Sequence, residues 1–213
     1  MAGERERLKL LIATHNRGKA RELVRELEGA LFDLLTLADL NISQDVEETG
    51  QTLEENARLK ATTYAGLFGL WTLADDSGLE VEALGGEPGP RSRRYAGDDA
   101  TDPERIRFLL KRLEGVQPAK RRARFRSVIA IVSPEGEVYT CEGTCEGEIA
   151  LTPLGTGGFG YDPVFFIPEL GKTMAELSLE EKNQVSHRGK AARKAAEALK
   201  SLDREFNRSL QRE

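Results

Sequence analysis

The stretch LLIATHNRGKAREL, residues 10–23, sets the fold class because it changes from an apolar strand to a helix within a few positions. Its apolar start predicts a buried strand over 9–14, and the apolar residues at helical spacing after it predict a helix over 17–29. The polar turn between them faces the free N–H groups of the helix N-terminus, which suits it to an anion. The same residues are compatible with an ordinary solvent-facing turn, and this stretch alone does not decide between the two.

The turn resembles a Walker A phosphate loop, but it departs from the pattern G-x-x-x-x-G-K-[ST] at both ends. Ala13 stands where the first glycine is needed, and Ala20 stands where a hydroxyl would bind the metal. Any Mg²⁺ that serves this turn therefore needs carboxylates from elsewhere in the chain. Glu48, Asp75 and Asp76 are natural suppliers, since Mg²⁺ prefers carboxylate oxygens together with phosphate and water.

Strand and helix patterns alternate along the rest of the chain and predict an α/β fold. The strand over 71–75 is expected to end at the residues Asp75-Asp76-Ser77-Gly78, which also read as a simple turn. A long hairpin over 123–150 makes the predicted sheet mixed. No internal repeat or linker is visible, so residues 1–213 are expected to form one domain. The other predicted elements are a helix opened by the capping box Thr52-x-x-Glu55, a helix over 103–114, the strand 164–167 and a helix over 188–210.

Composition and charge exclude several classes of protein. The net charge of −5 gives no overall attraction to nucleic acid or to an anionic membrane. No apolar run approaches the roughly 20 residues that span a bilayer, and the N-terminus lacks the apolar core of a secretory signal. We therefore expect a cytoplasmic protein. The two cysteines, Cys141 and Cys145, are too far apart along a predicted strand to form a disulfide.

The basic run KRRARFR, residues 120–126, suggests an RNA-binding surface at first sight. Its arginines alternate with Ala123, Phe125 and Ser127, however, as on the charged outer face of a strand. The alternation favours that reading over nucleic-acid binding. The second arginine cluster, GPRSRR over 89–94, follows the acidic pair closely and is better placed to meet phosphates.

Two further segments carry side chains suited to binding a planar base. The loop GTGGFGYDP, residues 155–163, holds Phe159 and Tyr161, which could stack on a base or simply pack inward. Asp162 could accept a hydrogen bond from a ring N–H. The segment Ser186-His187-Arg188-Gly189 supplies donors, and because no nucleophile motif accompanies the histidine, a binding role is favoured. Lys182 adds a cation, unless it is an ordinary surface charge.

Six short motifs in a fixed order resemble the inosine triphosphate pyrophosphatase family, also called XTP/dITP diphosphatases, and especially its bacterial branch. The resemblance extends over about residues 9–200. The motifs are T-x-N-x-x-K at 14–19, EETG at 47–50, NAxxKA at 56–61, ADDSGL at 74–79, GGFGYDP at 157–163 and SHRGKA at 186–191.

This resemblance implies a fold, an activity and a set of site residues. The implied fold is an elongated mixed β-sheet flanked by helices in two lobes, with the active cleft between them, in a homodimer. The implied activity is Mg²⁺-dependent hydrolysis of ITP, dITP or XTP to the monophosphate and pyrophosphate. Stable binding to nucleic acid or membranes is not expected.

The site residues that the resemblance implies fall into three groups. The catalytic proton acceptor would be Asp76, which would also bind Mg²⁺ with Glu48 and Asp75. The residues expected to bind the triphosphate, or to contact the substrate beside it, are Thr14, His15, Asn16, Arg17, Gly18, Lys19, Lys60 and Ser77. The residues expected to form the base pocket are Phe159, Gly160, Tyr161, Asp162, Lys182, His187 and Arg188. The roles of Arg91, Arg93 and His15 stay open, because relatives often differ at these positions.

Three rival functions make different predictions. A nucleotide-binding regulator would bind triphosphates without releasing pyrophosphate. An RNA-binding protein that uses 120–126 and 91–94 would show strongly salt-dependent RNA affinity. A broad triphosphate pyrophosphatase would hydrolyse ATP as readily as ITP.

Overall fold

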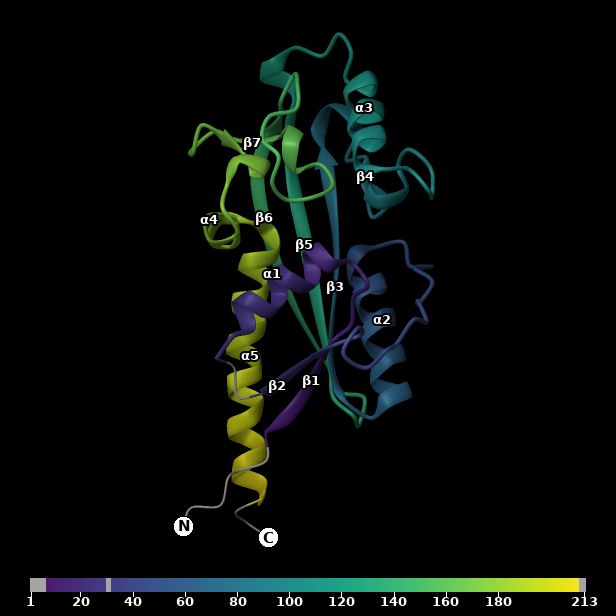
Figure 1. Ribbon diagram of the computed structural model, residues 1–213, viewed down its shortest axis with the longest axis vertical. Coiled ribbons are helices and arrows are strands. Elements are labelled where there is room, and N and C mark those ends of the chain that lie inside the picture. Colours follow the sequence, from purple (N-terminus) through teal and green to yellow (C-terminus); the bar gives the residue numbers. More distant parts are fainter. Residues whose placement is uncertain (1–6, 30–31, 211–213) are drawn as a thin grey trace.

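A single mixed sheet runs the length of the molecule in the computed structural model, which describes residues 7–29 and 32–210, with no side-chain detail for 203–210 (Figure 1). The strand order is β2-β1-β3-β5-β6-β7-β8, and β4 pairs with β3. β1 is parallel to β2 and β3, whereas the remaining pairs are antiparallel. The strands are β1 Leu8–Ile12, β2 Phe32–Thr36, β3 Trp71–Val81, β4 Pro88–Gly89, β5 Arg122–Val132, β6 Val138–Ile149, β7 Phe165–Ile167 and β8 Lys172–Thr173.

Helices cover both faces of the lower half of this sheet. α1 and α5 share one apolar cluster with β1 and β3, while α2 packs on the opposite face (Figure 1). A third cluster, under α3, forms the core of the upper lobe together with residues of β5, β6 and β7. The helices are α1 Arg17–Leu27, α2 Leu53–Phe68, α3 Asp102–Arg112, α4 Leu179–Val185 and α5 His187–Leu210.

The predicted fold class is confirmed: the sheet is mixed, elongated and flanked by helices in two lobes. The expectation of one domain over 1–213 stays a prediction, since residues 1–6, 30–31 and 211–213 lie outside the described residues. None of the helices in the described part of the chain is long and apolar enough to cross a membrane.

The helices that matter for the site begin where the sequence predicts. Asn16 caps α1, its side-chain oxygen accepting a hydrogen bond from the Lys19 N–H at 3.0 Å. Thr52 and Glu55 form the predicted capping box, with each side chain bonded to the other residue's backbone N–H. α2 ends at Gly69, whose φ of +61° places it in the left-handed region that glycine adopts without strain.

The prediction that the strand over 71–75 ends at Asp75-Asp76-Ser77-Gly78 is wrong. β3 continues to Val81, because β5 pairs with it in antiparallel register from Thr72–Val132 to Val81–Ala123. Asp, Ser and Gly are poor strand formers, but tertiary pairing overrides that preference. Gly78 is required here, since a Cβ at this position would lie 2.3 Å from the Gly89 carbonyl oxygen of β4.

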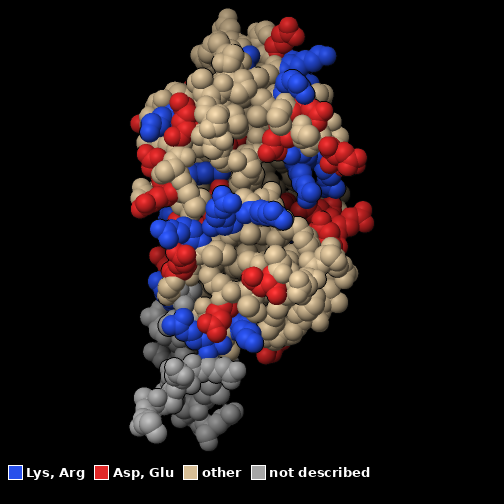
Figure 2. Space-filling view, viewed as in Figure 1, with Lys and Arg blue, Asp and Glu red and all other residues tan. Residues whose placement is uncertain are grey.

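The basic run on β5 behaves as the alternation predicts. Ala123 and Phe125 are buried, whereas the Arg124 and Arg126 side chains extend outward and form ion pairs with Glu80 on β3. Figure 2 shows that Lys and Arg side chains on one face gather across the middle of the molecule, beside a hollow between the two lobes.

Candidate functional site

A cleft between the two lobes collects most of the residues singled out from the sequence. Segments from both lobes line it: the β1–α1 turn, α2, β3, the short 3-10 helix Ser92–Arg94, the start of α3, the glycine loop and the start of α5. The predicted residues that line the cleft are Thr14, His15, Asn16, Lys19, Glu48, Lys60, Asp76, Ser77, Phe159, Gly160, Tyr161, Asp162, His187 and Arg188. Arg17, Gly18, Asp75 and Lys182 are not part of the lining.

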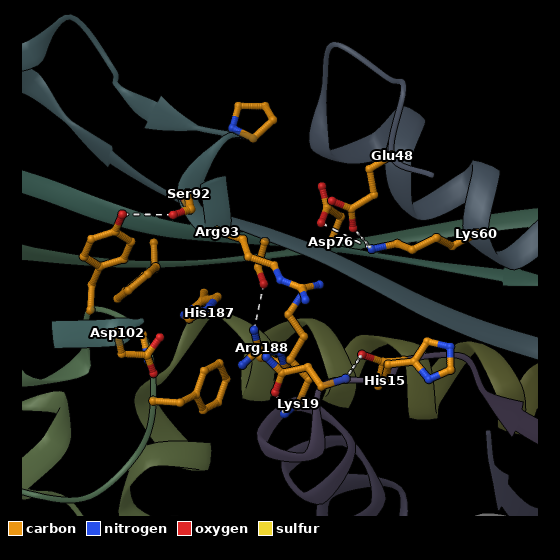
Figure 3. A pocket seen from close by; sticks show the side chains of 18 of the residues that line it. His15, Lys19, Glu48, Lys60, Asp76, Ser92, Arg93, Asp102, His187 and Arg188 are labelled. Carbon is orange, nitrogen blue, oxygen red and sulfur yellow. Dashed lines mark hydrogen bonds and ion pairs between the residues drawn. The ribbon is translucent and has the colours of Figure 1, made fainter. Parts of the chain in front are cut away.

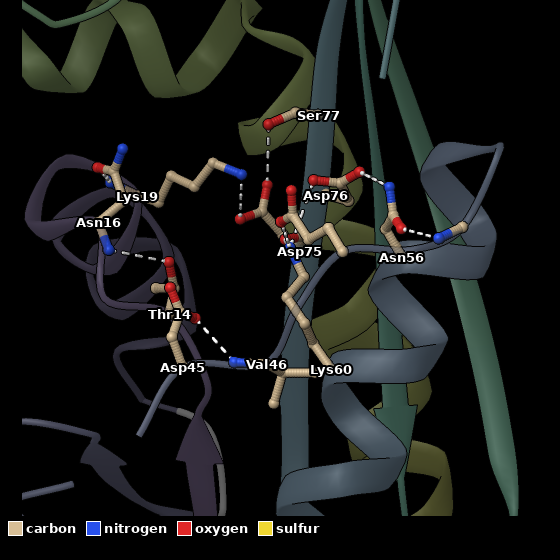
Figure 4. Close-up of polar contacts among 12 residues, drawn as sticks. Thr14, Asn16, Lys19, Asp45, Val46, Asn56, Lys60, Asp75, Asp76 and Ser77 are labelled. Atoms are coloured by element: carbon tan, nitrogen blue, oxygen red, sulfur yellow. Dashed lines mark hydrogen bonds and ion pairs between the residues drawn. The ribbon is translucent and has the colours of Figure 1, made fainter. Parts of the chain in front are cut away.

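The β1–α1 turn presents polar groups at the floor of the cleft (Figure 4). The Thr14 hydroxyl accepts the Asn16 N–H at 3.2 Å, and Asn16 in turn caps α1. Lys19 lies in the first turn of α1. Burial lowers the pKa of its ammonium group, despite the nearby Asp75 carboxylate. A helix N-terminus with a lysine and free N–H groups is a site for an anion.

Glu48 and Asp76 meet around a lysine on the opposite wall. Lys60 Nζ lies 2.7 Å from Glu48 Oε1 and 3.3 Å from Asp76 Oδ1, and it also donates to the Asp75 carbonyl at 2.8 Å. Asn56 holds the second Asp76 oxygen at 3.2 Å, and its own carbonyl accepts the Gly50 N–H at 2.8 Å (Figure 4). Two carboxylates are thereby fixed within hydrogen-bond distance of the same lysine.

The two carboxylates have pKa values displaced in opposite directions. Burial, together with the negative charges of Glu48 and Asp75, raises the pKa of Asp76, although Lys60 and Lys19 oppose the shift. Burial would also raise the pKa of Glu48, but Lys60, Lys19 and Arg94 outweigh it and lower that pKa. Asp76 is therefore the stronger base of the two, which suits it to accept a proton.

Asp75 lies on the other face of β3, because successive strand side chains alternate. Its carboxylate receives the Arg188 Nε at 3.0 Å and the Ser77 and Ser127 hydroxyls, and Lys19 Nζ lies 3.2 Å away. Burial would raise its pKa, but Lys19 and Arg188 hold the pKa far below the usual range. Direct metal binding by Asp75 stays a prediction: its hydrogen bonds all fall on Oδ2, whereas Oδ1 accepts none among the described residues and has Lys19 Nζ 3.2 Å away.

The acidic side chains of the cleft offer Mg²⁺ part of a ligand set. In the part of the chain that the structure describes, no group of three or more His, Cys, Asp and Glu side chains is arranged to hold a metal. Glu48 and Asp76 do place two carboxylates at one wall of the cleft. Mg²⁺ is commonly held by one or two carboxylates plus phosphate oxygens and water, so these residues fit a metal that binds together with a phosphate-bearing ligand.

The two aromatic residues of the glycine loop, residues 155–163, have different surroundings. Tyr161 is buried in the upper-lobe core and donates its hydroxyl to the Ser92 carbonyl at 2.9 Å, so it packs inward. Phe159 stays at the cleft and lies against Gly18, where an added Cβ would approach its ring to 2.5 Å. The absence of a side chain at Gly18 thus lets the loop close onto the N-terminus of α1.

Lys182 is a buried cation and not a surface charge. Its Nζ lies 2.5 Å from Asp162 Oδ2 and 2.6 Å from Glu22 Oε1, and 4.6 Å from the centre of the Phe159 ring. Burial raises the pKa of Asp162 in spite of this partner. Lys182 therefore supports the glycine loop from below.

Arg188 and His187 begin α5 at the back of the cleft (Figure 3). Arg188 donates to Asp75 and Glu22 and, at 2.7 Å, to the Ser77 hydroxyl. His187 stacks on Phe125 with ring centres 4.6 Å apart, and its Nδ1 has no hydrogen-bond partner among the described residues. Burial and the cations Arg188 and Lys182 hold the pKa of His187 well below its usual value, so the ring is neutral at pH 7.

His15, whose role the sequence left open, lies at the outer edge of the cleft. Its Nε2 is 2.9 Å from the Gln44 carbonyl oxygen and 3.3 Å from the Tyr64 hydroxyl. These contacts tie the β1–α1 turn to the segment that precedes Glu48.

Sequence reasoning missed several residues at the site: Glu22, Asn56, Ser92, Asp102 and Arg105. Glu22 follows Lys19 by three positions and so lies on the same helix face, which is the one signal that pointed to it. Asn56 lies in the motif NAxxKA but was given no role there. Ser92, Asp102 and Arg105 have no such signal, since a helix start such as Asp102 looks the same whether or not it faces a site.

Several known proteins are similar to this chain over most of its length. A model of the Ham1 family matches residues 10–198. The chain is 52% identical over 183 residues to a dITP/XTP pyrophosphatase of Geobacter sulfurreducens, covering 86% of this chain and 92% of that protein. It is likewise 52% identical over 193 residues to a dITP/XTP pyrophosphatase of Thermus thermophilus, covering 91% and 92%.

Solved structures extend the agreement to the fold. The structure of a HAM1 protein from Coxiella burnetii superposes with a TM-score of 0.83 at 41% identity, covering 91% of this chain and 99% of the other. Sequence family, curated relatives and solved fold all confirm the resemblance noted from the six motifs. This chain belongs to the Ham1 family.

Proposed function

We propose that this protein hydrolyses the deaminated purine nucleotides ITP, dITP and XTP to their monophosphates and pyrophosphate, with Mg²⁺. The observation that carries the proposal is the meeting of Glu48 and Asp76 around Lys60, across the cleft from the N-terminus of α1. A carboxylate pair opposite an anion site is what cleavage of a phosphoanhydride requires. The dITP/XTP pyrophosphatase relatives support the substrate class.

The triphosphate would lie between the β1–α1 turn and α2. Thr14, Asn16 and the first N–H groups of α1, which include those of Arg17 and Gly18, would donate to its oxygens. Lys19 and Lys60 would balance part of its charge, and Ser77 also lines the cleft. Glu48 and Asp76 would hold Mg²⁺, which when bound neutralises charge on the phosphates.

Asp76 would accept the proton of the attacking water. As the water oxygen forms its bond to the α-phosphorus, the bond to the bridging oxygen breaks and pyrophosphate leaves. Asn56 and Lys60 keep its carboxylate oriented for this proton transfer. No covalent intermediate is required.

Base selection would occur at the other end of the cleft. Hypoxanthine and xanthine carry a 6-oxo acceptor, which Arg188, His187 or backbone donors could satisfy, whereas the 6-amino group of adenine would leave those donors unpaired. Phe159 would contact the base, and Asp162 and Lys182 support its loop. We propose that residues 159–162 disfavour the 2-amino group of guanine.

The deciding experiment measures pyrophosphate release from ITP, dITP, XTP, GTP and ATP, with and without Mg²⁺. The expected result is release from the first three that depends on Mg²⁺ and far exceeds release from ATP. Binding without release would indicate a regulator, and equal rates on ATP would indicate a broad pyrophosphatase. The resemblance also supports a cytoplasmic location and a homodimer. A sedimentation mass equal to that of a single chain would contradict the homodimer.

A further inference from the structure

The glycine loop is also held from above, by the upper lobe. The Gly160 N–H donates to Asp102 Oδ2 at 2.7 Å, and the Tyr161 hydroxyl donates to the Ser92 carbonyl at 2.9 Å. Asp102 is the first residue of α3 and lies 58 positions away in the sequence. The tip of the loop therefore depends on a residue of another element for its backbone hydrogen bond.

Asp102 is itself fixed by a neighbouring arginine. Its second oxygen accepts a hydrogen bond from Arg105, one helical turn further along α3. Arg105 also donates to the Arg93 carbonyl at 2.9 Å and to the Ala100 carbonyl. The Arg105 side chain is only 14% exposed, so the pair forms an anchored unit and not a loose surface ion pair.

Two carboxylates divide the backbone donors of the loop between them. Asp162 accepts the Phe159 N–H at 2.9 Å, and Asp102 accepts the next N–H, that of Gly160. Gly160 has a φ of +61°, in the left-handed region, so this short turn is a geometry that few other residues adopt. Phe159 and Gly160 both line the cleft, and the position of the Phe159 ring follows from the backbone that these bonds fix.

We infer that Asp102, held by Arg105, is a positioning residue that sets the glycine loop against the purine base. This inference rests on the proposed role of 159–162 in base binding. It concerns the base end of the cleft, because Asp102 bonds to Gly160 and Arg105 and makes no hydrogen bond or ion pair with the β1–α1 turn or the Glu48–Asp76 pair among the described residues. Loss of Asp102 should therefore weaken recognition of the base and leave the triphosphate end unchanged.

The test compares Asp102→Ala with Asp102→Asn, which keeps an oxygen acceptor for the Gly160 N–H. Alanine should raise KM for ITP by about tenfold, as expected for the loss of one good hydrogen bond, with kcat changed less than about twofold. Asparagine should restore most of the affinity. The inhibition constant of inorganic triphosphate, a probe without a base, should be the same in all three proteins.

The exposed Asp98, in the same segment before α3, supplies the matched control Asp98→Ala, whose KM should equal that of the wild type. An unchanged KM in Asp102→Ala overturns the inference, as does an equal loss of inorganic triphosphate binding or an asparagine variant no better than alanine. If wild-type protein releases no pyrophosphate from ITP, the proposed function itself fails. Melting temperatures within a few degrees of the wild type confirm that each variant is folded.

Discussion

Asp75 and Asp76 are adjacent in the sequence, but the alternation of β3 gives them separate surroundings. Asp75 joins Lys19 and Arg188 in a buried network on the α1 and α5 face. Asp76 faces α2, where Lys60 and Asn56 contact it. The mutual repulsion expected of two neighbouring carboxylates is therefore lessened by geometry and by nearby cations, although the Asp75 charge still contributes to the raised pKa of Asp76.

At this residue scale, Asp76→Asn is expected to lower kcat for ITP by about 10²–10⁴-fold, the usual contribution of a general base. Asparagine keeps the size of the side chain but cannot accept the proton. Steady-state pyrophosphate release measures the effect, and circular dichroism checks the fold. Asp33→Asn, at an exposed position on β2, serves as the control. A variant of Asp76 that kept a tenth or more of the activity would refute its catalytic role.

The histidine that begins α5 gives a pH-dependent prediction. Because His187 is buried and neutral, its pKa in the folded protein is depressed below that of the unfolded chain. Its contribution to stability is therefore present above the unfolded pKa of about 6.5 and is lost as the pH falls below it, at up to about 1.4 kcal/mol per pH unit. We expect wild-type protein to lose stability relative to His187→Asn between pH 7 and 5.

Urea unfolding at several pH values measures this difference directly. Comparison with the variant is needed because the raised pKa values of Asp76 and Asp162 act in the opposite direction in both proteins. A constant stability difference between wild type and His187→Asn would contradict a buried neutral histidine.

Among the elements, α2 does most to position the side chains around Glu48 and Asp76. It starts at a capping box, carries Asn56 and Lys60 one turn apart on the face toward β3, and buries Ala57, Ala61 and Tyr64 beside them. The placement of Lys60 against two carboxylates thus depends on where the helix begins and how it packs. A shift in that starting point would move both polar side chains together.

Thr52→Ala removes the cap and is expected to lower the free energy of unfolding by about 1 kcal/mol. Urea denaturation measures the change. Thr62→Ala is the matched control, because Thr62 is exposed within the same helix and alanine has the higher helix propensity there. Equal destabilisation by the two substitutions would show that the loss does not come from capping.

The predictions of helices and strands succeeded where the spacing of apolar residues and the capping or turn residues gave a strong signal. The capping box of α2, the β5–β6 hairpin and the helix of α5 all appear close to the predicted limits. The short strands β2, β4 and β8 and the helix α4 were not predicted. β4 and β8 each have two residues, too few for any period to show, and their pairing with β3 and β7 is what defines them.

For the whole molecule, the cleft lies where the two lobes meet along one sheet. The groups proposed to bind phosphate come from the lower lobe, whereas the glycine loop belongs to the upper one and closes onto α1 through Phe159 and Gly18. Buried ion pairs of Lys182 and Arg188 with Glu22 join α1 to α4 and α5 beneath the cleft. Such buried pairs are costly to break, so they fix the positions of α1, α4 and α5 relative to one another.

The sequence by itself determined the family, the mixed α/β fold and most of the residues at the cleft, because six motifs in a fixed order carry that information locally. It could not show that Asp75 and Asp76 point to opposite faces, since a run of Asp, Ser and Gly looks like a turn until β5 pairs with it. Nor could it show that Tyr161 packs inward or that Asp102 holds Gly160. Those roles depend on contacts between residues far apart in the chain, which only the tertiary structure brings within hydrogen-bond distance.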